Sequence, residues 1–264
     1  MGIIYAAGNL NDVNTVLSVT SEDTVYIKEW MYNRRQSKPF RFTAKSGNQI
    51  LIDGGAGGIS PTIAALMNHN LAGTSGGGAF LCKIKGDDNN PPGGGWDAPT
   101  YSRDIAWHTL NMYKLLDGAP TYRYWLLDID DFDNALTGCN IGEFVLTEWG
   151  TFSRGVEPGS RRSHEHLIFD NETPYGQRWK AFKATRDAFS VSFPAFTDTK
   201  YRSEVQAFFD ALQGVYPFVF IPDEDEDDCW YMEVPNILEA ERQFKDCNSF
   251  TLDLIEQTRG ITIL

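Results

Sequence analysis

Short apolar runs, separated by Gly, Pro, Asn and Asp, restrict the fold of this chain more than any other feature. The 264 residues include 24 Gly and 12 Pro. Runs such as PFRFTA (39–44), NQILIDGG (48–55) and PFVFI (217–221) indicate strands, because each is short and bounded by turn-forming residues. Clear helical periodicity is rare. We therefore predict a mainly β protein.

One stretch departs from this pattern. In DTKYRSEVQAFFDALQG (198–214) the apolar residues recur at the spacing of one helical face, and Gly214 lies where a C-cap glycine belongs. The residues on that face are Tyr201, Val205, Phe208, Phe209 and Leu212. The spacing predicts a short helix over 199–213, packed against a neighbouring sheet.

A second helix candidate, SRDIAWHTLNMYKLLDG (102–118), is less amphipathic. It follows the low-complexity stretch GDDNNPPGGGWDAP (86–99). Strand patterns flank both segments. We expect residues 86–118 to form a long excursion inserted between two strands.

Composition restricts the functional classes. The chain has no run of eighteen apolar residues and no signal-peptide pattern, so we expect a protein without a membrane span or cleaved signal. A net charge of −13 argues against nucleic-acid binding, which needs a basic face. The four cysteines, Cys82, Cys139, Cys229 and Cys247, lack CxxC spacing and predict free, mostly buried thiols in a reducing cytoplasm.

The most concentrated charge lies in PDEDEDDCWY (222–231). Its consecutive acidic residues are Asp223, Glu224, Asp225, Glu226, Asp227 and Asp228. They separate PFVFI from CWYMEV (229–234), so we predict an acidic loop between two antiparallel strands. A calcium loop of the EF-hand type needs Gly at position 6 and Glu at position 12, where this chain has Asp228 and Val234. The loop is expected to face water, a cation or a space through which something passes.

A second acidic group lies in LLDIDDFDN (126–134). Its members are Asp128, Asp130, Asp131 and Asp133. Asp128 and Asp130 fall on one face of the predicted strand. Acids at a strand end usually form a solvated rim. A glycan-binding or cation-binding rim and a glycosidase carboxylate pair are the alternatives.

The four histidines of the chain are the first candidates for metal ligands. His164 and His166 would point to one face of a strand, with Asp170 on the same face and Glu165 between the histidines. Two arginines directly before them favour ordinary surface histidines. His69 lies between two asparagines and is predicted to be a turn residue, and nothing pairs with His108 by spacing.

Catalytic motifs are missing from the sequence. It contains no G-x-S-x-G, no H-E-x-x-H and no P-loop, since GTSGGG (73–78) lacks the Lys-Ser/Thr pair. We therefore predict no enzymatic activity, no catalytic residue, no cofactor and no bound metal.

The order of the strand patterns resembles a known family. PFRFTA, LIDGG (51–55), MNHNLAG (67–73), YRYWLLDI (122–129) and NIGEFVLTE (140–148) resemble the galactose-binding-like (discoidin-type) jelly-roll sandwich. The variant they are most similar to occurs in tail proteins of bacteriophage virions. The resemblance covers roughly residues 10 to 150. It implies a sandwich domain over 1–150, with the excursion at about 86–118.

The remaining segment, 151–264, resembles small phage tail subunits of the tail-tube and distal-tail kind. It contains a long hairpin pattern (160–196), the predicted helix, PFVFIPD (217–223) and a last strand in SFTLDLIEQTRGI (249–261). The resemblance implies a β domain that closes into a ring around a lumen. It also implies a cyclic homo-oligomer, with a hexamer expected, that contacts neighbouring tail-tube and baseplate proteins in the virion tail after synthesis in the host cytoplasm.

Two functional hypotheses follow. The first is a structural virion protein of a phage tail tip or baseplate that forms a ring around the DNA channel and presents the sandwich outward. An acidic loop lining that channel would repel phosphates and let DNA slide. The alternative is a carbohydrate-binding adhesin module that recognises a host surface glycan through its acidic loops. Both hypotheses predict no specific nucleic-acid binding and no membrane contact.

Overall fold

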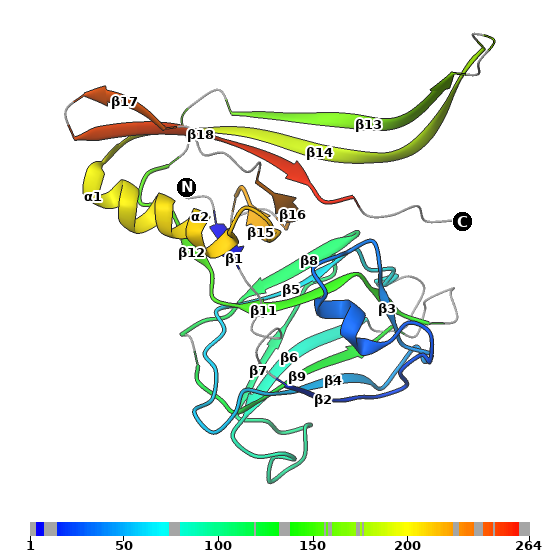
Figure 1. Cartoon of the computed structure of the whole chain (residues 1–264). Helices are drawn as coiled ribbons and strands as arrows, with labels where there is room; N and C mark the ends of the chain where they lie inside the picture. Colours follow the sequence, from blue (N-terminus) through cyan, green and yellow to red (C-terminus); the bar gives the residue numbers. More distant parts are fainter. Residues whose placement is uncertain are drawn as a thin grey trace.

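The computed structural model describes residues 4–7, 15–73, 80–118, 120–131, 138–155, 157, 160–172, 175, 177–223, 227–234, 240–244 and 246–258. These residues form a mainly antiparallel β structure with one short helical region, as predicted. Figure 1 shows a lower lobe of packed sheets and an upper lobe that holds a long hairpin and the helix. No helix among the described residues is long and apolar enough to cross a membrane.

The lower lobe is a β-sandwich. A five-stranded sheet runs in the order β2 (Thr15–Val19), β4 (Asn48–Asp53), β9 (Tyr124–Asp130), β6 (Leu81–Asp87) and β7 (Tyr101–Asp104). A three-stranded sheet runs in the order β11 (Glu143–Thr147), β5 (Ile63–Met67) and β8 (Asn111–Leu115). A small pair, β3 (Phe40–Arg41) with β10 (Asn140–Ile141), and a 3-10 helix, Lys28–Tyr32, complete the sandwich.

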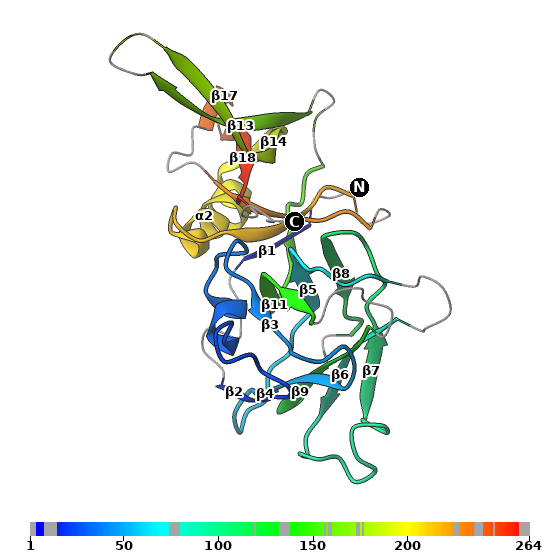
Figure 2. The same cartoon turned by 90° about the vertical axis from the view of Figure 1, so that its right-hand side faces the viewer.

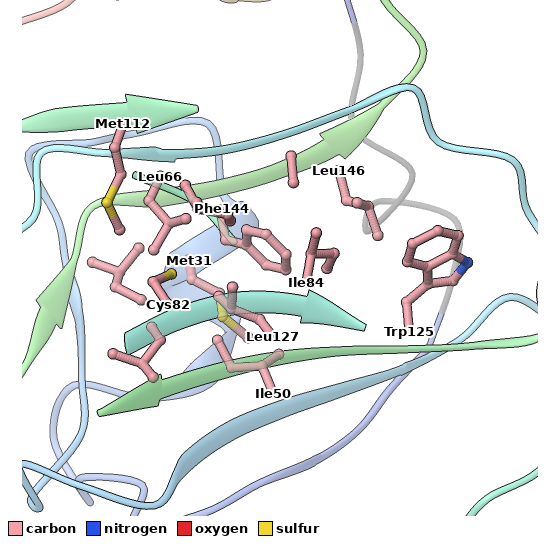
Figure 3. Close-up of a cluster of buried hydrophobic side chains, with 14 of the residues drawn as sticks. Met31, Ile50, Leu66, Cys82, Ile84, Met112, Trp125, Leu127, Phe144 and Leu146 are labelled. Carbon is pink, nitrogen blue, oxygen red and sulfur yellow. The ribbon is translucent and has the colours of Figure 1, made fainter. Parts of the chain in front are cut away.

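The sandwich core lies between its two larger sheets. Every second residue of a strand points inward, so Ile50 and Ile52 of β4 meet Leu66 of β5 and Phe144 of β11. Figure 3 shows Ile50, Leu66 and Phe144 among the side chains between the two sheets, with Trp125 at one end of the cluster. Cys82, Cys139 and Cys229 are free and buried, as predicted for these three.

The upper lobe is built on one large sheet. Its strands are β12 (Gly150–Thr151), β1 (Ile4–Ala7), β15 (Phe218–Ile221), β16 (Trp230–Glu233), β18 (Cys247–Glu256), β14 (Arg178–Thr197) and β13 (Arg161–Glu172) in this order, and β17 (Ala240–Phe244) also pairs with β18. Figure 2 shows the β13–β14 hairpin projecting away from the rest of the lobe. The predicted long hairpin and the strands on either side of the acidic loop are confirmed.

Strands at the junction of the lobes are buried on both faces. In β5, Ala64 and Leu66 face the sandwich core, whereas Ile63, Ala65 and Met67 face the upper lobe. In β15, Val219 and Ile221 meet them, and Phe218 and Phe220 point into the core of the upper lobe. The three apolar clusters therefore form a continuous stack through both lobes.

The helix lies where the sequence predicts it. It spans Asp198 to Leu212 as α1 (Asp198–Lys200), a π-helical segment (Tyr201–Gln206) and α2 (Ala207–Leu212). Val205, Phe208 and Leu212 are buried against the large sheet. Gln213 has a left-handed conformation with φ of 51°, and Gly214 follows with φ of 66°, so the predicted glycine lies one residue after the left-handed cap.

The prediction for residues 86–118 is wrong. The segment is not an excursion with a helix: β6 extends to Asp87, β7 forms an edge of the five-stranded sheet, and β8 pairs with β5. The helix prediction failed at β8, because alternate side chains of this strand pack into two different apolar clusters. Met112 faces the sandwich core, and Tyr113 and Leu115 pack toward the upper lobe. Burial on both faces removed the simple alternation that identifies a strand.

The predicted domain boundary also differs at the N-terminal side. Residues Ile4–Ala7 form β1, which pairs with β15 and β12 of the large sheet. The segment therefore belongs to the upper lobe although the sequence assigned residues 1–150 to the sandwich. From Ile4–Ala7 in the upper lobe, the chain passes into the sandwich and then back into the upper lobe.

Phe208 tests the packing of the helix. Its ring centroid lies 4.4 Å from that of Tyr5 and 5.1 Å from that of Phe218. We expect Phe208→Ala to lower the free energy of unfolding by about 3–5 kcal/mol, because a cavity replaces these contacts. Lys200→Ala, at an exposed position of the same helix, is the control and should change it by less than about 0.5 kcal/mol. Urea denaturation measures both changes. Equal effects would show that the helix does not bury the face that carries Phe208.

Candidate functional site

The acidic loop connects β15 to β16. Its last acidic residue, Asp228, contacts the sandwich. Asp223 is half-buried and Asp227 exposed, while Glu224, Asp225 and Glu226 lie outside the described residues. Asp228 is half-buried, and its Oδ1 lies 3.2 Å from Nε2 of His108 in the sandwich. This contact joins residues far apart in the sequence, so no spacing rule could predict it.

The second acidic group is tied into the sandwich by its own chain. Asp128 forms an ion pair with Lys85 at 2.5 Å. Asp130 accepts a hydrogen bond from the backbone of Gly47 at 2.5 Å, and Asp131 accepts one from the backbone of Ala72 at 2.9 Å. Asp131 is fully buried, so the interpretation as a solvated rim is wrong for this residue. Asp133 lies outside the described residues.

A pocket of about 300 Å³ lies where the base of the β13–β14 hairpin meets the sandwich. The sandwich contributes the segment that leads into β8 and the first residue of β8. The upper lobe contributes β13, β14, β18, the last residue of the acidic loop and the two residues after it. The lining residues are His108, Thr109, Leu110, Asn111, Arg162, His164, Thr185, Arg186, Asp187, Asp228, Cys229, Trp230 and Glu256. The pocket thus collects two of the histidines weighed from the sequence.

Asp187 organises the upper-lobe side of this pocket. Its buried carboxylate accepts hydrogen bonds from Arg162 Nη2 at 2.8 Å and from the Trp230 indole at 2.9 Å, and it also contacts Nδ1 of His164. Its backbone N–H donates to Glu256 at 3.0 Å. Through these hydrogen bonds the Asp187 carboxylate links β13, β14 and β16, and the bond from the Arg162 guanidinium is charge-assisted. No sequence pattern could have identified Asp187, because its partners come from other parts of the chain.

The histidine pair of β13 does not form a metal centre with its predicted neighbours. His164 and His166 lie on one face, as expected, opposite Asp187 and Thr185 of β14. The intervening Glu165 instead binds Arg186 at 2.6 Å. Within the described part of the chain, no group of three or more His, Cys, Asp or Glu side chains is arranged to hold a metal ion.

The distal half of the β13–β14 hairpin carries exposed apolar side chains. Ile168 and Phe182 lie opposite each other and are 52% and 67% exposed. Trp179 and Tyr175 are also exposed. Ion pairs between Glu172 and Arg178 and between Asp170 and Lys180 flank them across the two strands. Exposed apolar side chains thus gather on this ribbon.

Comparisons with known proteins gave a limited result. No protein-family model matches the chain, and no curated protein does. Two solved structures are similar to it: a fucose-binding module of Streptococcus pneumoniae (12% identity, TM-score 0.38) and the CBM32-1 module of a family 31 glycoside hydrolase from Clostridium perfringens (9% identity, TM-score 0.37). Each match covers 53% of this chain and 96% of the module. With TM-scores below 0.5, neither likeness assigns a ligand to this chain.

His69 gives a pH dependence that can be measured. The side chain is buried, and its Nδ1 accepts a hydrogen bond from the backbone N–H of Leu71 at 3.2 Å. Burial lowers the pKa of His69 from 6.5 to about 4; a hydrogen bond with the His108 backbone opposes this shift, and the charge of the His108 ring adds to it. The unfolded chain therefore binds the proton at a higher pH than the folded chain.

This difference in the pKa of His69 adds to the free energy of unfolding. The contribution is complete above pH 6.5 and is lost as the pH falls from 6.5 to about 4. The loss should amount to roughly 3 kcal/mol. His69→Asn keeps an acceptor for the Leu71 amide, as in an Asx turn, but does not titrate. Urea denaturation at pH 7.5 and pH 4 should show the larger loss in the unmodified protein. Equal losses in the two proteins would show that His69 does not cause it.

Proposed function

We propose that this protein is a structural subunit that assembles with copies of itself through the β13–β14 hairpin, as a ring-forming component of a phage tail tip or baseplate. One observation carries the proposal: the distal hairpin continues the core-facing side of the sheet into solvent and keeps apolar side chains on it. The role in a virion tail rests on the resemblance noted in the sequence.

The distal hairpin extends beyond the sheet that supports its base. β14 pairs with β18 only from Ala188 onward, so between Arg178 and Asp187 its strand partner is β13 alone. A two-stranded ribbon is at best marginally stable in water. Arg162 of β13 lies over the rings of Phe189 and Trp230 in the core. A register shift between Leu167 and Ile168 leaves its extra residue, Lys183, in β14, so the side chains of β13 keep alternating and Ile168 shares the face of Arg162. Ile168 therefore faces the core side of the sheet, at a point where the chain provides no cover among its described residues.

The sheet also has open edges for the assembly of a ring. Among the described strands, β13 pairs only with β14, and β17 pairs only with β18. The block β17–β18–β14–β13 thus carries one open edge on each side. Pairing the β13 edge of one copy with the β17 edge of the next would be a head-to-tail contact, which generates a closed ring when the rotation closes.

The sandwich would occupy a fixed position on such a ring. Besides the apolar junction, Gln257 accepts a hydrogen bond from the backbone of Gln36 at 3.0 Å and donates to the carbonyl of Arg34 at 2.8 Å. Asn111 donates to the backbone carbonyl of Cys229 at 2.8 Å from within the junction. Satisfied buried polar contacts favour one docking geometry. A sandwich held in this way is a rigid part of the subunit.

Glycan binding by the sandwich is the alternative. Its predicted residues Asp128, Asp130 and Asp131 already bind groups of their own chain, which argues against an open carboxylate rim at this place.

We also propose that the acidic loop lines the lumen of the ring. This position can be tested only on the assembled particle.

The exposed pair on the hairpin tests the assembly. We expect the unmodified protein to form a ring of one stoichiometry in native mass spectrometry and negative-stain electron microscopy. The double variant Ile168→Ser, Phe182→Ser should weaken each subunit contact at least tenfold, because burying one such side chain contributes about 1.5–3 kcal/mol. Its melting temperature as a monomer should change little, since both side chains are exposed in the single chain.

Val25→Ser is the matched control, because Val25 is 63% exposed but lies in the sandwich. It should assemble like the unmodified protein. A protein that stays monomeric at every concentration, or a double variant that still forms rings with the same affinity, would overturn the proposal. A monomer that binds glycans on an array would favour the adhesin instead.

A further inference from the structure

A basic surface lies on the sandwich, although the chain as a whole is acidic. Residues 26–41 contain five of the 23 Lys and Arg residues and one of the 36 Asp and Glu residues, whereas the net charge of the chain is −13. They include the 3-10 helix Lys28–Tyr32 and the strand β3. Positive charge is thus concentrated on one part of an otherwise negative protein.

Two aromatic rings hold two of these cations in place. The rings of Tyr26 and Trp30 meet edge to face, with 5.6 Å between their centroids. Nζ of Lys38 lies 4.0 Å from the centroid of Trp30, and the guanidinium carbon of Arg41 lies 4.3 Å from that of Tyr26. Cation–π contacts position a charged group without neutralising it. We call Tyr26, Trp30, Arg35, Lys38 and Arg41 the basic surface.

The cations of the basic surface have no carboxylate in ion-pair contact among the described residues. Arg35 and Lys38 are exposed and lie in one turn, in which the Lys38 N–H donates to the Arg35 carbonyl at 2.9 Å. Nε of Arg41 donates to the neutral side chain of Asn140 at 2.9 Å. The Asp23 carboxylate is near Arg41, but it accepts two backbone N–H groups of its own turn. The described ion pairs involve other residues, so these three positive charges are available to a partner.

A carboxylate-rich partner fits the basic surface best. Guanidinium and ammonium groups form charge-assisted hydrogen bonds with carboxylates, and the densest carboxylates of the chain are those of the acidic loop, Asp223–Asp228. A nucleic acid fits less well, because its phosphates would extend past the basic surface onto the rest of a protein with a net charge of −13. Charge complementarity therefore favours the acidic loop.

The described ends of the acidic loop lie on the other side of the same copy. Arg34, beside the basic surface, covers the ring of Tyr216 at 3.6 Å from its centroid. Tyr216 comes shortly before β15, whereas the loop follows β15, so an extended chain places Tyr216 and Asp223 roughly 20 Å apart. Asp228 contacts His108, shortly before β8. Figure 2 shows β8 and the blue 3-10 helix on opposite sides of the sandwich.

We propose that, in the self-assembly proposed above, on which this inference rests, the basic surface of one copy binds the acidic loop of the next copy. Complementary surfaces on opposite sides of a subunit produce a head-to-tail contact, which generates a ring when the rotation closes. The acidic residues of the loop outnumber the cations Arg35, Lys38 and Arg41. The contact therefore keeps an excess of negative charge, in agreement with a loop that also borders the lumen.

Carbodiimide cross-linking of the full chain tests the contact directly. The reagent joins a lysine amine to a carboxylate that touches it, and a mixture of nitrogen-15-labelled and unlabelled protein separates links between copies from links within one copy. Mass spectrometry should find Lys38 joined to the acidic loop, with one partner labelled and the other unlabelled. Lys200, exposed on the helix, is the control and should not be joined to the loop.

Charge reversal tests whether the contact contributes to assembly. The double variant Arg35→Glu, Lys38→Glu should weaken the subunit contact at least tenfold in native mass spectrometry of a dilution series. The control Lys200→Glu, Arg202→Glu reverses the same two charges at exposed positions of the helix and should assemble like the unmodified protein. Mixing the first variant with a copy that carries Asp225→Lys and Asp227→Lys should restore assembly at least tenfold. Unchanged melting temperatures show that each variant folds.

The outcomes separate this contact from the ring itself. Rings that form with no link between Lys38 and the loop of another copy, and with unaltered affinity in Arg35→Glu, Lys38→Glu, would overturn the contact and leave the ring. A protein that stays monomeric and shows no such link would overturn both. Links between Lys38 and the loop of another copy without closed rings would support the contact and overturn the ring.

Discussion

The apolar junction between the sandwich and the large sheet is the contact on which the rest of the structure depends. Ile63, Ala65 and Met67 of β5 meet Val219 and Ile221 of β15, while the opposite faces of both strands are already buried in the lobe cores. Strands covered on both sides cannot rotate or slide without exposing apolar surface on two faces. The junction therefore fixes the two lobes as one body and sets where the polar groups at its border meet.

This arrangement explains why the polar groups collect at the border. The apolar stack ends near Asn111 and Cys229, and the next residues outward are His108 and Asp228, whose Nε2 and Oδ1 lie 3.2 Å apart. At the same border, Asp187 takes hydrogen bonds from Arg162 and the Trp230 indole. Buried polar groups need partners: Asn111 and His108 find theirs across the lobes, whereas Asp187 finds its partners within the upper lobe.

Much of the fold was predictable because local patterns agree with tertiary packing. The helix and its buried Phe208 follow from periodicity, and the acidic loop follows from the short apolar runs on either side. Residues 102–118 were mispredicted because β8 buries both faces, and β1 was misassigned because its partner β15 is far along the chain. The contact of His108 with Asp228 was beyond local reasoning for the same reason, since only the docking of the lobes brings the two side chains together.

The β13–β14 hairpin differs from the strands of the junction, because its distal part is not covered on its core-facing side. Near its base, the core-facing side of β14 is covered, and Phe189 and Val191 are buried. Beyond Asp187 that cover ends, but the strands continue and Phe182 is exposed. Because the junction holds the lobes rigidly, the direction of the hairpin relative to the sandwich is set by the fold. A second copy that binds the hairpin would therefore meet the sandwich at one defined angle, which is the property that a closed ring requires of its subunits.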